Sequence, residues 1–192
     1  MRVISGVSGE LSGELFSKVS NYRHKVFIEM LGWELQTQQG IELDQFDRPD
    51  TVYVVSQNDD GGVNGCARLL PTDRPYLLGE VFPQLLNGQT LPSSADIWEL
   101  SRFAAVDFSN QMSPTQGKFS SEVAVELLRR TIACAVENGA KGLIAVTTVG
   151  VERLMRCAGF RSHRAGPPMI INGHPIVACW VDVGANLEGY GV

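Results

Sequence analysis

Apolar residues in the first fifty positions recur with the period of a helix and then lose any period. Four of them are spaced four, three and four residues apart: Leu15, Val19, Tyr22 and Val26. This spacing predicts an amphipathic helix over roughly residues 12–30, with Ser12 as a candidate cap at its start. Residues 32–50 have no steady period and contain Gly, Gln and Asp, so we expect a long loop there. Loops of this length inside a compact domain are uncommon and are often functional.

The next part of the chain is rich in β-branched and aromatic residues, which favour strands. Residues 51–57 (TVYVVSQ) and 63–70 (VNGCARLL) are two such runs, and the NDDGG between them predicts a hairpin. Residues 71–92 contain too many Pro and Gly for one element, whereas residues 96–105 (DIWELSRFAA) predict a third strand. We therefore expect an antiparallel meander in this half of the molecule.

Helices and strands alternate in the second half. A helix is predicted over about residues 120–138, with Gly139 just past its end, and a shorter helix over residues 149–159. Residues 142–148 and 175–183 are apolar runs with the length of buried strands. The whole order predicts a single α/β domain with one mixed sheet, helices on its faces and right-handed β–α–β crossovers.

Composition narrows the class of protein. The chain has 192 residues, 44% hydrophobic and 19% charged, which is typical of a globular protein. We find no run of about 18 apolar residues and no signal-peptide pattern, so we expect a cytoplasmic protein with no membrane partner. The four Cys and three His are scattered without metal-ligand spacing, so no metal site is expected. The net charge of −5 argues against a nucleic-acid partner.

The charge is nevertheless uneven along the sequence. Residues 118–164 carry 8 basic side chains against 4 acidic ones, in a chain that is acidic as a whole. Such a region has two interpretations of similar weight. It can consist of ordinary solvated helix faces, or it can be a docking surface for an acidic partner, because clustered charge steers association. Composition alone leaves both interpretations open.

The strand predicted at residues 96–105 carries charges that a buried strand should not have. Side chains alternate between the two faces of a strand, so a regular strand places Glu99, Ser101 and Phe103 on one face and Arg102 on the other. Arg68 raises the same question one strand earlier. Buried charges persist when they are paired, so these residues either pair with one another or line a cleft where a polar ligand completes the pairing. A β-bulge or a twist would bring both Glu99 and Arg102 to the cleft. Otherwise Glu99 alone faces the cleft, and Arg102 contacts the N-terminal segment that covers the sheet.

Four segments resemble motifs of a known family: YRHKVFIEMLGWEL (22–35), ELDQFDRPDTVYVV (42–55), GCARLLPTDRPYLLGEVFP (65–83) and WELSRF (98–103). They are similar to the acyl-homoserine-lactone synthases of bacterial quorum sensing, the LuxI-type autoinducer synthases. TTVGVERLMRCAGF and HRAGPP resemble the C-terminal half of the same family, so the resemblance covers essentially the whole chain. Ten residues fall in order on the positions that these motifs define: Arg23, Phe27, Trp33, Asp44, Asp47, Arg68, Phe82, Glu99, Ser101 and Arg102.

The resemblance implies a fold similar to the GNAT N-acetyltransferases, an α/β/α sandwich around a mixed, twisted sheet. Residues 1–192 would form one synthase domain. Within it, residues 12–50 would cover the S-adenosylmethionine site, and residues 118–192 would form the half that takes the acyl chain and the carrier protein. The implied reaction transfers an acyl group from acyl carrier protein to the α-amino group of S-adenosylmethionine. The methionyl carboxylate then closes the lactone and 5′-methylthioadenosine leaves. Both reactants are substrates, so no cofactor is expected.

The resemblance also implies roles for the charged residues. Glu99 is the first candidate for the base that takes the proton of the amine, because its strand is rigid and burial would raise its pKa. Asp44 and Asp47 are alternatives, but we favour them as electrostatic partners of the sulfonium. Arg23 and Arg102 suit a carboxylate, either that of the substrate or those of these acids. The remaining matched residues would bind substrate or make polar contacts: Phe27, Trp33, Arg68, Phe82 and Ser101.

An apolar tunnel is needed for the acyl chain, and each candidate for its wall is also a candidate for ordinary core: Phe103, Val125, Leu128, Leu143, Ala145, Thr147 and Leu154. Family members that use 3-oxo chains tend to have Thr on the strand of residues 142–148, and the register leaves Ala145 and Thr147 both open. Acyl carrier protein is acidic, so the basic region gains a candidate partner through four residues: Arg153, Arg156, Arg161 and Arg164.

Two other functions fit parts of the sequence. The first is a GNAT-like acyltransferase that uses acyl-CoA and another amine, although VGVERL after the strand of residues 142–148 is a poor match to a Gly-rich pyrophosphate loop. The second is a catalytically inactive relative that binds the ligand as a sensor. The intact set of Arg, Asp and Glu argues against the sensor.

Overall fold

The computed structural model describes residues 1–35, 40–108, 118–119 and 121–187. The strands are β1 (Arg2–Val7), β2 (Val52–Gln57), β3 (Val63–Pro71), β4 (Ile97–Ala104), β5 (Val106–Asp107), β6 (Lys118–Phe119), β7 (Gly142–Thr148), β8 (Ser162–Arg164), β9 (Met169–Ile171) and β10 (His174–Val181). The helices are α1 (Gly13–Arg23), α2 (Leu77–Glu80), α3 (Ser121–Glu137), α4 (Val149–Cys157) and α5 (Val183–Leu187), with a π-helical segment η1 (His24–Met30) and a 3₁₀ segment η2 (Pro83–Leu86). None of the helices in the described part of the chain is long and apolar enough to cross a membrane.

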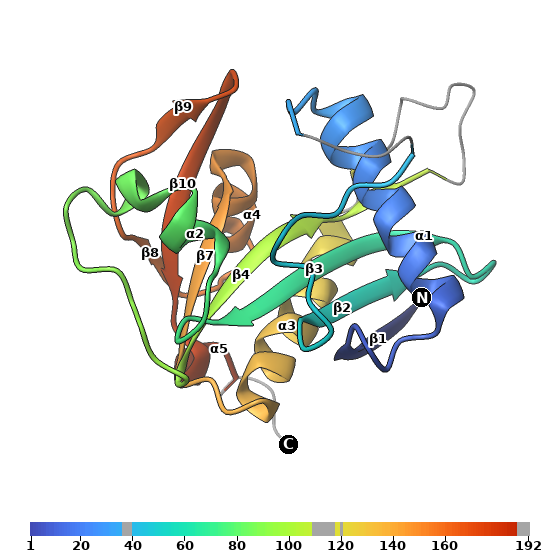
Figure 1. The fold of residues 1–192 in the computed structure, drawn as a ribbon, viewed down its shortest axis with the longest axis horizontal. Coiled ribbons are helices and arrows are strands. Elements are labelled where there is room, and N and C mark those ends of the chain that lie inside the picture. Colours follow the sequence, from blue (N-terminus) through green and yellow to red (C-terminus); the bar gives the residue numbers. More distant parts are fainter. Residues whose placement is uncertain (36–39, 109–117, 120, 188–192) are drawn as a thin grey trace.

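The main sheet is mixed, as the sequence predicts. Its order is β1-β2-β3-β4-β7-β10-β8, and β9 pairs with β10. Only the β4–β7 pair is parallel among the pairs of this sheet in the described residues. That pairing runs from Ile97 opposite Gly142 to Leu100 opposite Ala145. Beyond it the two strands separate, and the opening between them is visible in Figure 1.

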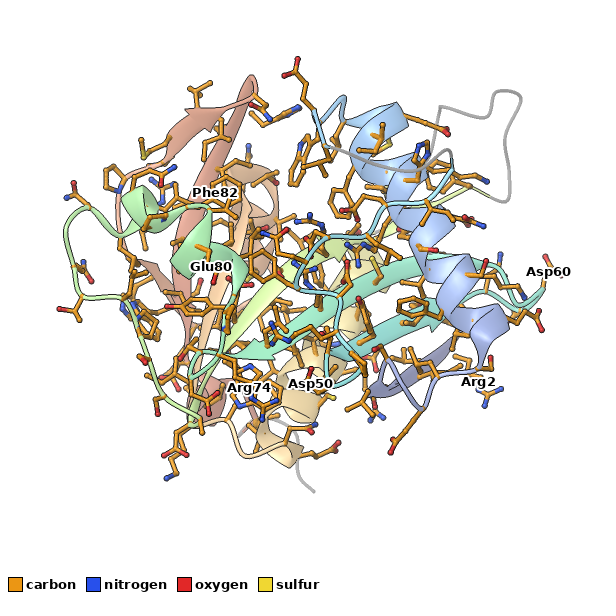
Figure 2. The ribbon with its side chains drawn as sticks, in the orientation of Figure 1. Arg2, Asp50, Asp60, Arg74, Glu80 and Phe82 are labelled. Carbon is orange, nitrogen blue, oxygen red and sulfur yellow. The ribbon has the colours of Figure 1, made fainter. Side chains whose placement is uncertain are left out.

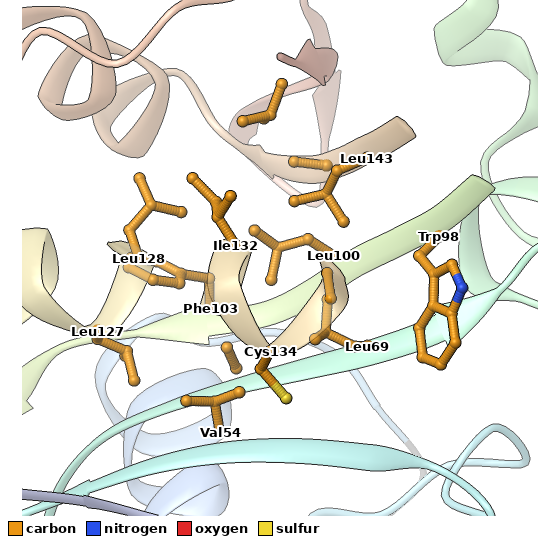
Figure 3. Close-up of a cluster of buried hydrophobic side chains, with 14 of the residues drawn as sticks. Val54, Leu69, Trp98, Leu100, Phe103, Leu127, Leu128, Ile132, Cys134 and Leu143 are labelled. Atoms are coloured by element: carbon orange, nitrogen blue, oxygen red, sulfur yellow. The ribbon is translucent and has the colours of Figure 1, made fainter. Parts of the chain in front are cut away.

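One face of the sheet packs on α3. The cluster there includes Val54, Leu69, Leu100 and Phe103 of the strands with Leu127, Leu128 and Ile132 of α3 (Figure 3). Full burial of each large apolar side chain stabilises the fold by about 1.5–3 kcal/mol. Met155 of α4 and Val183 of α5 belong to the same cluster, so all three later helices cover this face.

The opposite face has two separate covers. Leu15, Val19 and Tyr22 of α1 pack on Tyr53 and Val55 of β2. Farther along the sheet, the segment of α2 and η2 packs on Leu70, Ile144 and Ala178 through Leu78, Leu85 and Leu86. Figure 1 shows α1 and α2 above the same face, with the ends of β3 and β4 between them. This strip of sheet, which is covered by the loop of residues 40–50 and not by a helix, is where the charged residues lie.

The predicted elements are confirmed, and several short ones were missed. The first helix begins as predicted, since the Ser12 hydroxyl accepts the Leu15 N–H at 3.2 Å, and it continues as the π-helical segment η1. The structure adds β1, α2, η2, β5, β6, β8, β9 and α5. β1 gave no signal because its alternation of RVISGV is weak on a half-exposed edge, and the others have five residues or fewer. Residue 120, the expected first residue of the second long helix, lies outside the described residues.

A β-bulge in β4 decides which way its charged side chains point. The β3–β4 register is Arg68 opposite Ser101 but Cys66 opposite Ala104, so β4 holds one extra residue. Arg102 occupies it with φ of 52°, in the left-handed region that is uncommon for residues other than Gly. Of the two alternatives that the sequence left open, the β-bulge is confirmed, and the regular alternation of β4 ends at Ser101. Phe103 turns to the α3 face, and Arg102 shares the other face with Glu99.

Candidate active site

A cluster of six charged side chains lies on the strip between the two covers. Its members, called the ionic cluster below, are Arg23 of α1, Arg68 of β3, Arg102 of β4 and the loop residues Glu42, Asp44 and Asp47. Three guanidinium groups face three carboxylates, so their charges balance. Burial of ions is tolerated only with such pairing.

Asp47 binds Arg23 through both carboxylate oxygens. Arg23 Nη1 and Nη2 donate to Asp47 Oδ1 and Oδ2 at 2.8 and 3.0 Å, which is the strong bidentate geometry. The Tyr53 hydroxyl also donates to Asp47. Burial alone would raise the pKa of Asp47, but Arg23 and Arg68 outweigh it and hold that pKa far below its usual range. Asp47 is therefore a permanent anion.

Glu42 links two arginines and was missed by the sequence reasoning. Its Oε2 accepts from Arg23 Nε at 2.5 Å, and its Oε1 accepts from Arg102 Nε and Nη2 at 3.2 and 3.0 Å. Burial acts to raise the pKa of Glu42, yet Arg102 and Arg23 lower it overall. The available signal was its position two residues before Asp44 in the same loop.

Arg102 connects the ionic cluster to the aromatic residues. Its Nη2 donates to Asp44 Oδ2 at 2.8 Å, in addition to its bonds with Glu42. Its guanidinium carbon lies 5.6 Å from the centre of the Phe27 ring and 5.9 Å from that of Trp33, within cation–π range. The predicted link between Arg102 and the acids of the loop is present.

Arg68 is fully buried in the ionic cluster. Its Nη1 donates to Asp44 and Asp47 at 2.6 and 2.9 Å, and its Nε donates to Ser101 Oγ at 3.2 Å. Its guanidinium also lies over the ring of Phe46, 5.7 Å from the centre. Nη2 is buried and has no hydrogen-bond partner among the described residues. Ser101 thus contacts Arg68.

Glu99 stands on the same face but is not part of this network of ion pairs. Its oxygens accept the N–H of Leu77 at 3.3 Å and of Leu78 at 2.5 Å, at the start of α2. The side chain has no exposed surface. Burial raises the pKa of Glu99, and the Leu78 N–H and Arg68 offset only part of that effect. Glu99 is the one carboxylate of this face whose pKa is raised among those described with a shift.

Two cavities open beside the ionic cluster. The first, of about 360 Å³, is lined mainly by apolar residues of η1, of β4 from Arg102 onward and of the end of β7. The second, of about 220 Å³, includes Asp44, Phe46, Leu77 and Phe82 in its wall. Phe82 lies beside α2, away from α1 (Figure 2). Four residues line both cavities: Trp33, Arg102, Val146 and Thr147. The cavities therefore meet at the opening between β4 and β7.

The predicted tunnel residues divide between cavity wall and core. Phe103 and Thr147 line the first cavity, as do Phe27 and Trp33. Ala145 is buried against α3 in the core, together with Leu128 and Leu143, while Val125 and Leu154 are packed at its edge. Of the two candidates that the sequence left open, Thr147 lines the cavity and Ala145 does not.

The predicted docking residues lie on and after α4. Arg153, Arg156 and Arg161 are exposed. Arg164 instead binds Glu152, through Nε and Nη2 at 2.8 and 2.7 Å, so its charge is largely neutralised. Among the described residues, we find no cluster of His, Cys, Asp and Glu that could hold a metal ion.

Comparison with known proteins identifies close relatives. The family model described as autoinducer synthase matches residues 10–188. The acyl-homoserine-lactone synthase of Acinetobacter nosocomialis is 56% identical over 183 residues, covering 95% of this chain and all of that protein. The crystal structure of TofI in a ternary complex with an inhibitor and MTA is 41% identical, with a TM-score of 0.84, over 98% of this chain and 97% of that one. The AHL synthase LasI gives a TM-score of 0.84 at 34% identity, over 98% and 94%.

More distant structures define the wider fold. BjaI, a CoA-dependent acyl-homoserine lactone synthase solved with SAM and isopentyl-CoA, is 26% identical with a TM-score of 0.80, over 97% of this chain and 85% of that one. An acyl-CoA N-acyltransferase from Pseudomonas aeruginosa is 12% identical with a TM-score of 0.63, over 94% and 99%. The last similarity concerns the fold alone: the α/β fold with its mixed sheet is similar to that of GNAT-like acyltransferases.

Proposed function

The chain belongs to the acyl-homoserine-lactone synthases, the autoinducer synthase family, and on that premise we propose how its two cavities divide the reaction. The enzyme is an acyltransferase that makes a quorum-sensing signal. In our proposal the second cavity holds S-adenosylmethionine and the first holds the acyl chain. The observation that carries this proposal is their meeting at Arg102, where an apolar cavity shares one wall with a cavity that is lined by Asp44.

The second cavity suits a cationic, partly aromatic substrate. Asp44 lines it and keeps 15% of its side-chain surface exposed, so a carboxylate can face the sulfonium. Phe46, Phe82 and Trp33 offer ring faces to adenine or to the cation. Arg102, which lines the same space, suits the methionyl carboxylate. The relatives solved with MTA and with SAM support this assignment by analogy. Residues 12–50 would then cover this site, as proposed from the sequence.

The first cavity suits an acyl chain. Val26, Met30, Ala105 and Val151 are among its apolar wall residues, and its size falls in the usual range of about 300–1,000 Å³ for ligand pockets. We propose that the Thr147 hydroxyl contacts an oxygen at the 3-position of the chain when one is present. Residues 118–192, the half expected from the sequence to take the acyl chain, would supply only part of this site, because η1 and the end of β4 form much of its wall.

Attack on the thioester carbonyl requires donors for the oxyanion. Thr72 N–H donates to Ile97 C=O at 2.8 Å, and bonded pairs alternate in an antiparallel ladder. Glu99 and Ser101 therefore turn their backbone groups to β3. After the bulge, Ala104 faces Cys66, so the N–H of Phe103 turns to the opening between β4 and β7. We propose this N–H as an oxyanion donor.

We propose Glu99 as the proton acceptor for the α-amino group, acting through one water. Its raised pKa favours it over Asp47, whose lowered pKa makes a poor base. Its burial behind Leu77 and Leu78 excludes direct contact with an amine in the second cavity, which is why a water is required. Asp44 and Asp47 would act as electrostatic partners. Once acylated, S-adenosylmethionine would lactonise by attack of its own carboxylate on the γ-carbon, releasing 5′-methylthioadenosine.

The role of Glu99 as the base is tested with the variant Glu99→Gln, and Asp44→Asn serves as the comparison. The Gln side chain still accepts one N–H of α2 but cannot take a proton. We expect a fall in kcat of roughly 100-fold or more, with loss of the acidic limb of the pH profile of kcat/KM. Asp44→Asn should chiefly raise the KM for S-adenosylmethionine. An unchanged acidic limb in Glu99→Gln would exclude Glu99 as the base.

The acyl donor is proposed to be acyl carrier protein. Arg153, Arg156 and Arg161 present exposed positive charge next to the end of β7, and complementary charge speeds the docking of an acidic protein. Arg153→Glu and Arg156→Glu should each raise the KM for acyl-ACP and leave the KM for S-adenosylmethionine unchanged. Arg2→Glu, an equal charge change on an exposed residue of β1, is the control. If Arg153→Glu and Arg156→Glu leave the KM for acyl-ACP as unchanged as the control does, the result would favour a CoA-dependent reaction like that of BjaI.

The overall function is tested by expressing the chain in a host that makes no such signal. Mass spectrometry of the culture extract should detect an acyl-homoserine lactone, and its mass gives the chain length and the oxidation at the 3-position. The absence of any lactone would defeat the assignment and favour acylation of another amine.

A further inference from the structure

Trp33 separates the two cavities, yet no hydrogen bond of its side chain fixes it. Its indole N–H is buried without a partner among the described residues. The ring is held by other rings and by a guanidinium. The Phe27 ring centre lies 5.0 Å away, the His174 ring centre 6.3 Å away and the Arg102 guanidinium 5.9 Å away. The position of Trp33 therefore depends on its neighbours.

His174 is the neighbour that comes from the far end of the chain. It opens β10, directly after the tight turn of Asn172 and Gly173, whose φ angles are 48° and 78°. Its Nε2 lies 2.6 Å from the backbone oxygen of Leu31, 143 residues away. A carbonyl oxygen only accepts, so Nε2 carries the hydrogen and donates it. The bond ties the β9–β10 hairpin to the backbone just before Trp33.

The two tied elements both line the second cavity. Trp33 and Leu35 line it from the N-terminal side, and Ile171 and Asn172 line it from the hairpin. Figure 1 shows the hairpin and the N-terminal helix rising on opposite sides of the separated β4 and β7. A bond between these walls limits how far they part. We propose that His174 is a positioning residue, a latch that holds the Leu31–Leu35 segment across the opening and thereby fixes Trp33 between the two substrates.

The latch predicts a binding effect that a conservative substitution rescues. In His174→Gln the amide nitrogen reaches about as far as Nε2 and can donate to the same carbonyl. In His174→Phe the ring beside Trp33 remains but the donor is lost. We expect His174→Phe and His174→Ala to raise the KM for S-adenosylmethionine roughly fivefold, as one lost hydrogen bond does, with kcat changed less than about twofold. His174→Gln should match the wild type.

Hydrogen exchange tests the latch without any substrate. Four amides of the segment are bonded locally: Leu31, Gly32, Trp33 and Leu35 donate to Val26, Ile28, Phe27 and Trp33. These amides should exchange faster in the Phe and Ala variants than in the wild type, and at the wild-type rate in His174→Gln. The control is His163→Ala, an exposed His of β8. Unchanged exchange in all variants, or equal acceleration in Gln and Phe, would overturn the latch.

Only the KM measurements of the latch depend on the proposed function. If the wild type makes no lactone, the proposed function fails, while the exchange experiment still decides the latch.

In the active enzyme, a double variant tests whether His174 acts through Trp33. When His174→Ala is combined with Trp33→Phe, the rise in KM should be smaller than the product of the two single effects. Fully multiplicative effects would show that His174 acts independently of Trp33.

Discussion

Replacing Glu42 by Gln removes one negative charge from the ionic cluster without changing its volume. The Glu42 side chain is 1% exposed and accepts from both Arg23 and Arg102. The Gln side chain has only one acceptor oxygen, so its NH₂ group must face the guanidinium donor of either Arg23 or Arg102. Three guanidinium groups then share two carboxylates. The cluster would carry a net positive charge in a buried place.

The magnitude follows from this burial. Breaking a buried ion pair by removing one partner costs about 3–5 kcal/mol, whereas an exposed pair contributes about 0–1 kcal/mol. Because ordinary domains are stable by about 5–15 kcal/mol, the variant should lose a large share of its free energy of unfolding. At about 2–4 °C per kcal/mol for a chain of this size, its Tm should fall by roughly 6–20 °C.

Urea unfolding followed by circular dichroism measures this loss. The matched control is Glu29→Gln, because Glu29 is 36% exposed in its side chain and pairs only with His24 in the described contacts. That variant should stay within about 0.5 kcal/mol of the wild type. A loss below about 1 kcal/mol in Glu42→Gln, with an unchanged m value, would refute the reasoning. It would mean that the three arginines do not need a third anion.

Three further outcomes are expected. The lowered pKa values of Glu42 and Asp47 mean that their contribution to stability is complete above the unfolded values of about 4 and is lost as the pH falls through the folded values. The urea midpoint of the wild type should therefore drop more between pH 7 and pH 3 than that of Glu42→Gln, and equal drops would contradict this. Thr147→Val should reduce the preference for acyl donors with a 3-position oxygen by roughly tenfold. The preference is measured by mass spectrometry as the ratio of lactones with and without that oxygen, and an unchanged ratio would exclude the contact. Arg102→Gly should be more stable than Arg102→Ala by about 1 kcal/mol in urea, because only Gly relieves a φ of 52°; equal stabilities would show that the bulge relaxes.

The sequence predicted the elements that have a strong period and missed those that do not. Periodicity and apolar runs identified the helices α1 and α3 and the core strands β2, β3, β4, β7 and β10. The half-exposed β1 and the four residues of α2 carry no comparable signal. α2 nevertheless matters for the site, because two of its backbone N–H groups donate hydrogen bonds to the carboxylate oxygens of Glu99. Contacts between residues 21 positions apart cannot be derived from local spacing.

The site was predictable in its residue types and unpredictable in its partners. Arg68 and Arg102 stood out because charge is costly on a buried strand, and both are in fact paired. The pairing partner Glu42 did not stand out, since an acid in a polar loop is ordinary until the loop is known to lie over a sheet. Alternation along β4 predicted opposite faces for Glu99 and Arg102. Nothing in WELSRF marks Arg as the residue that takes the left-handed conformation.

The bulge in β4 ties the ionic cluster to the chemistry. A non-Gly residue in the left-handed region costs on the order of 1–3 kcal/mol, and the bonds of Arg102 to Glu42 and Asp44 offset that cost. The same bulge resets the alternation, so Phe103 faces α3, and in our proposal its backbone N–H turns toward the opening where β7 has already separated. One extra residue thus places a guanidinium over the proposed S-adenosylmethionine cavity and a backbone donor beside the proposed acyl cavity. The charged loop is then what stabilises the strand in this form, so the loop and the oxyanion donor are physically coupled even though they do not touch.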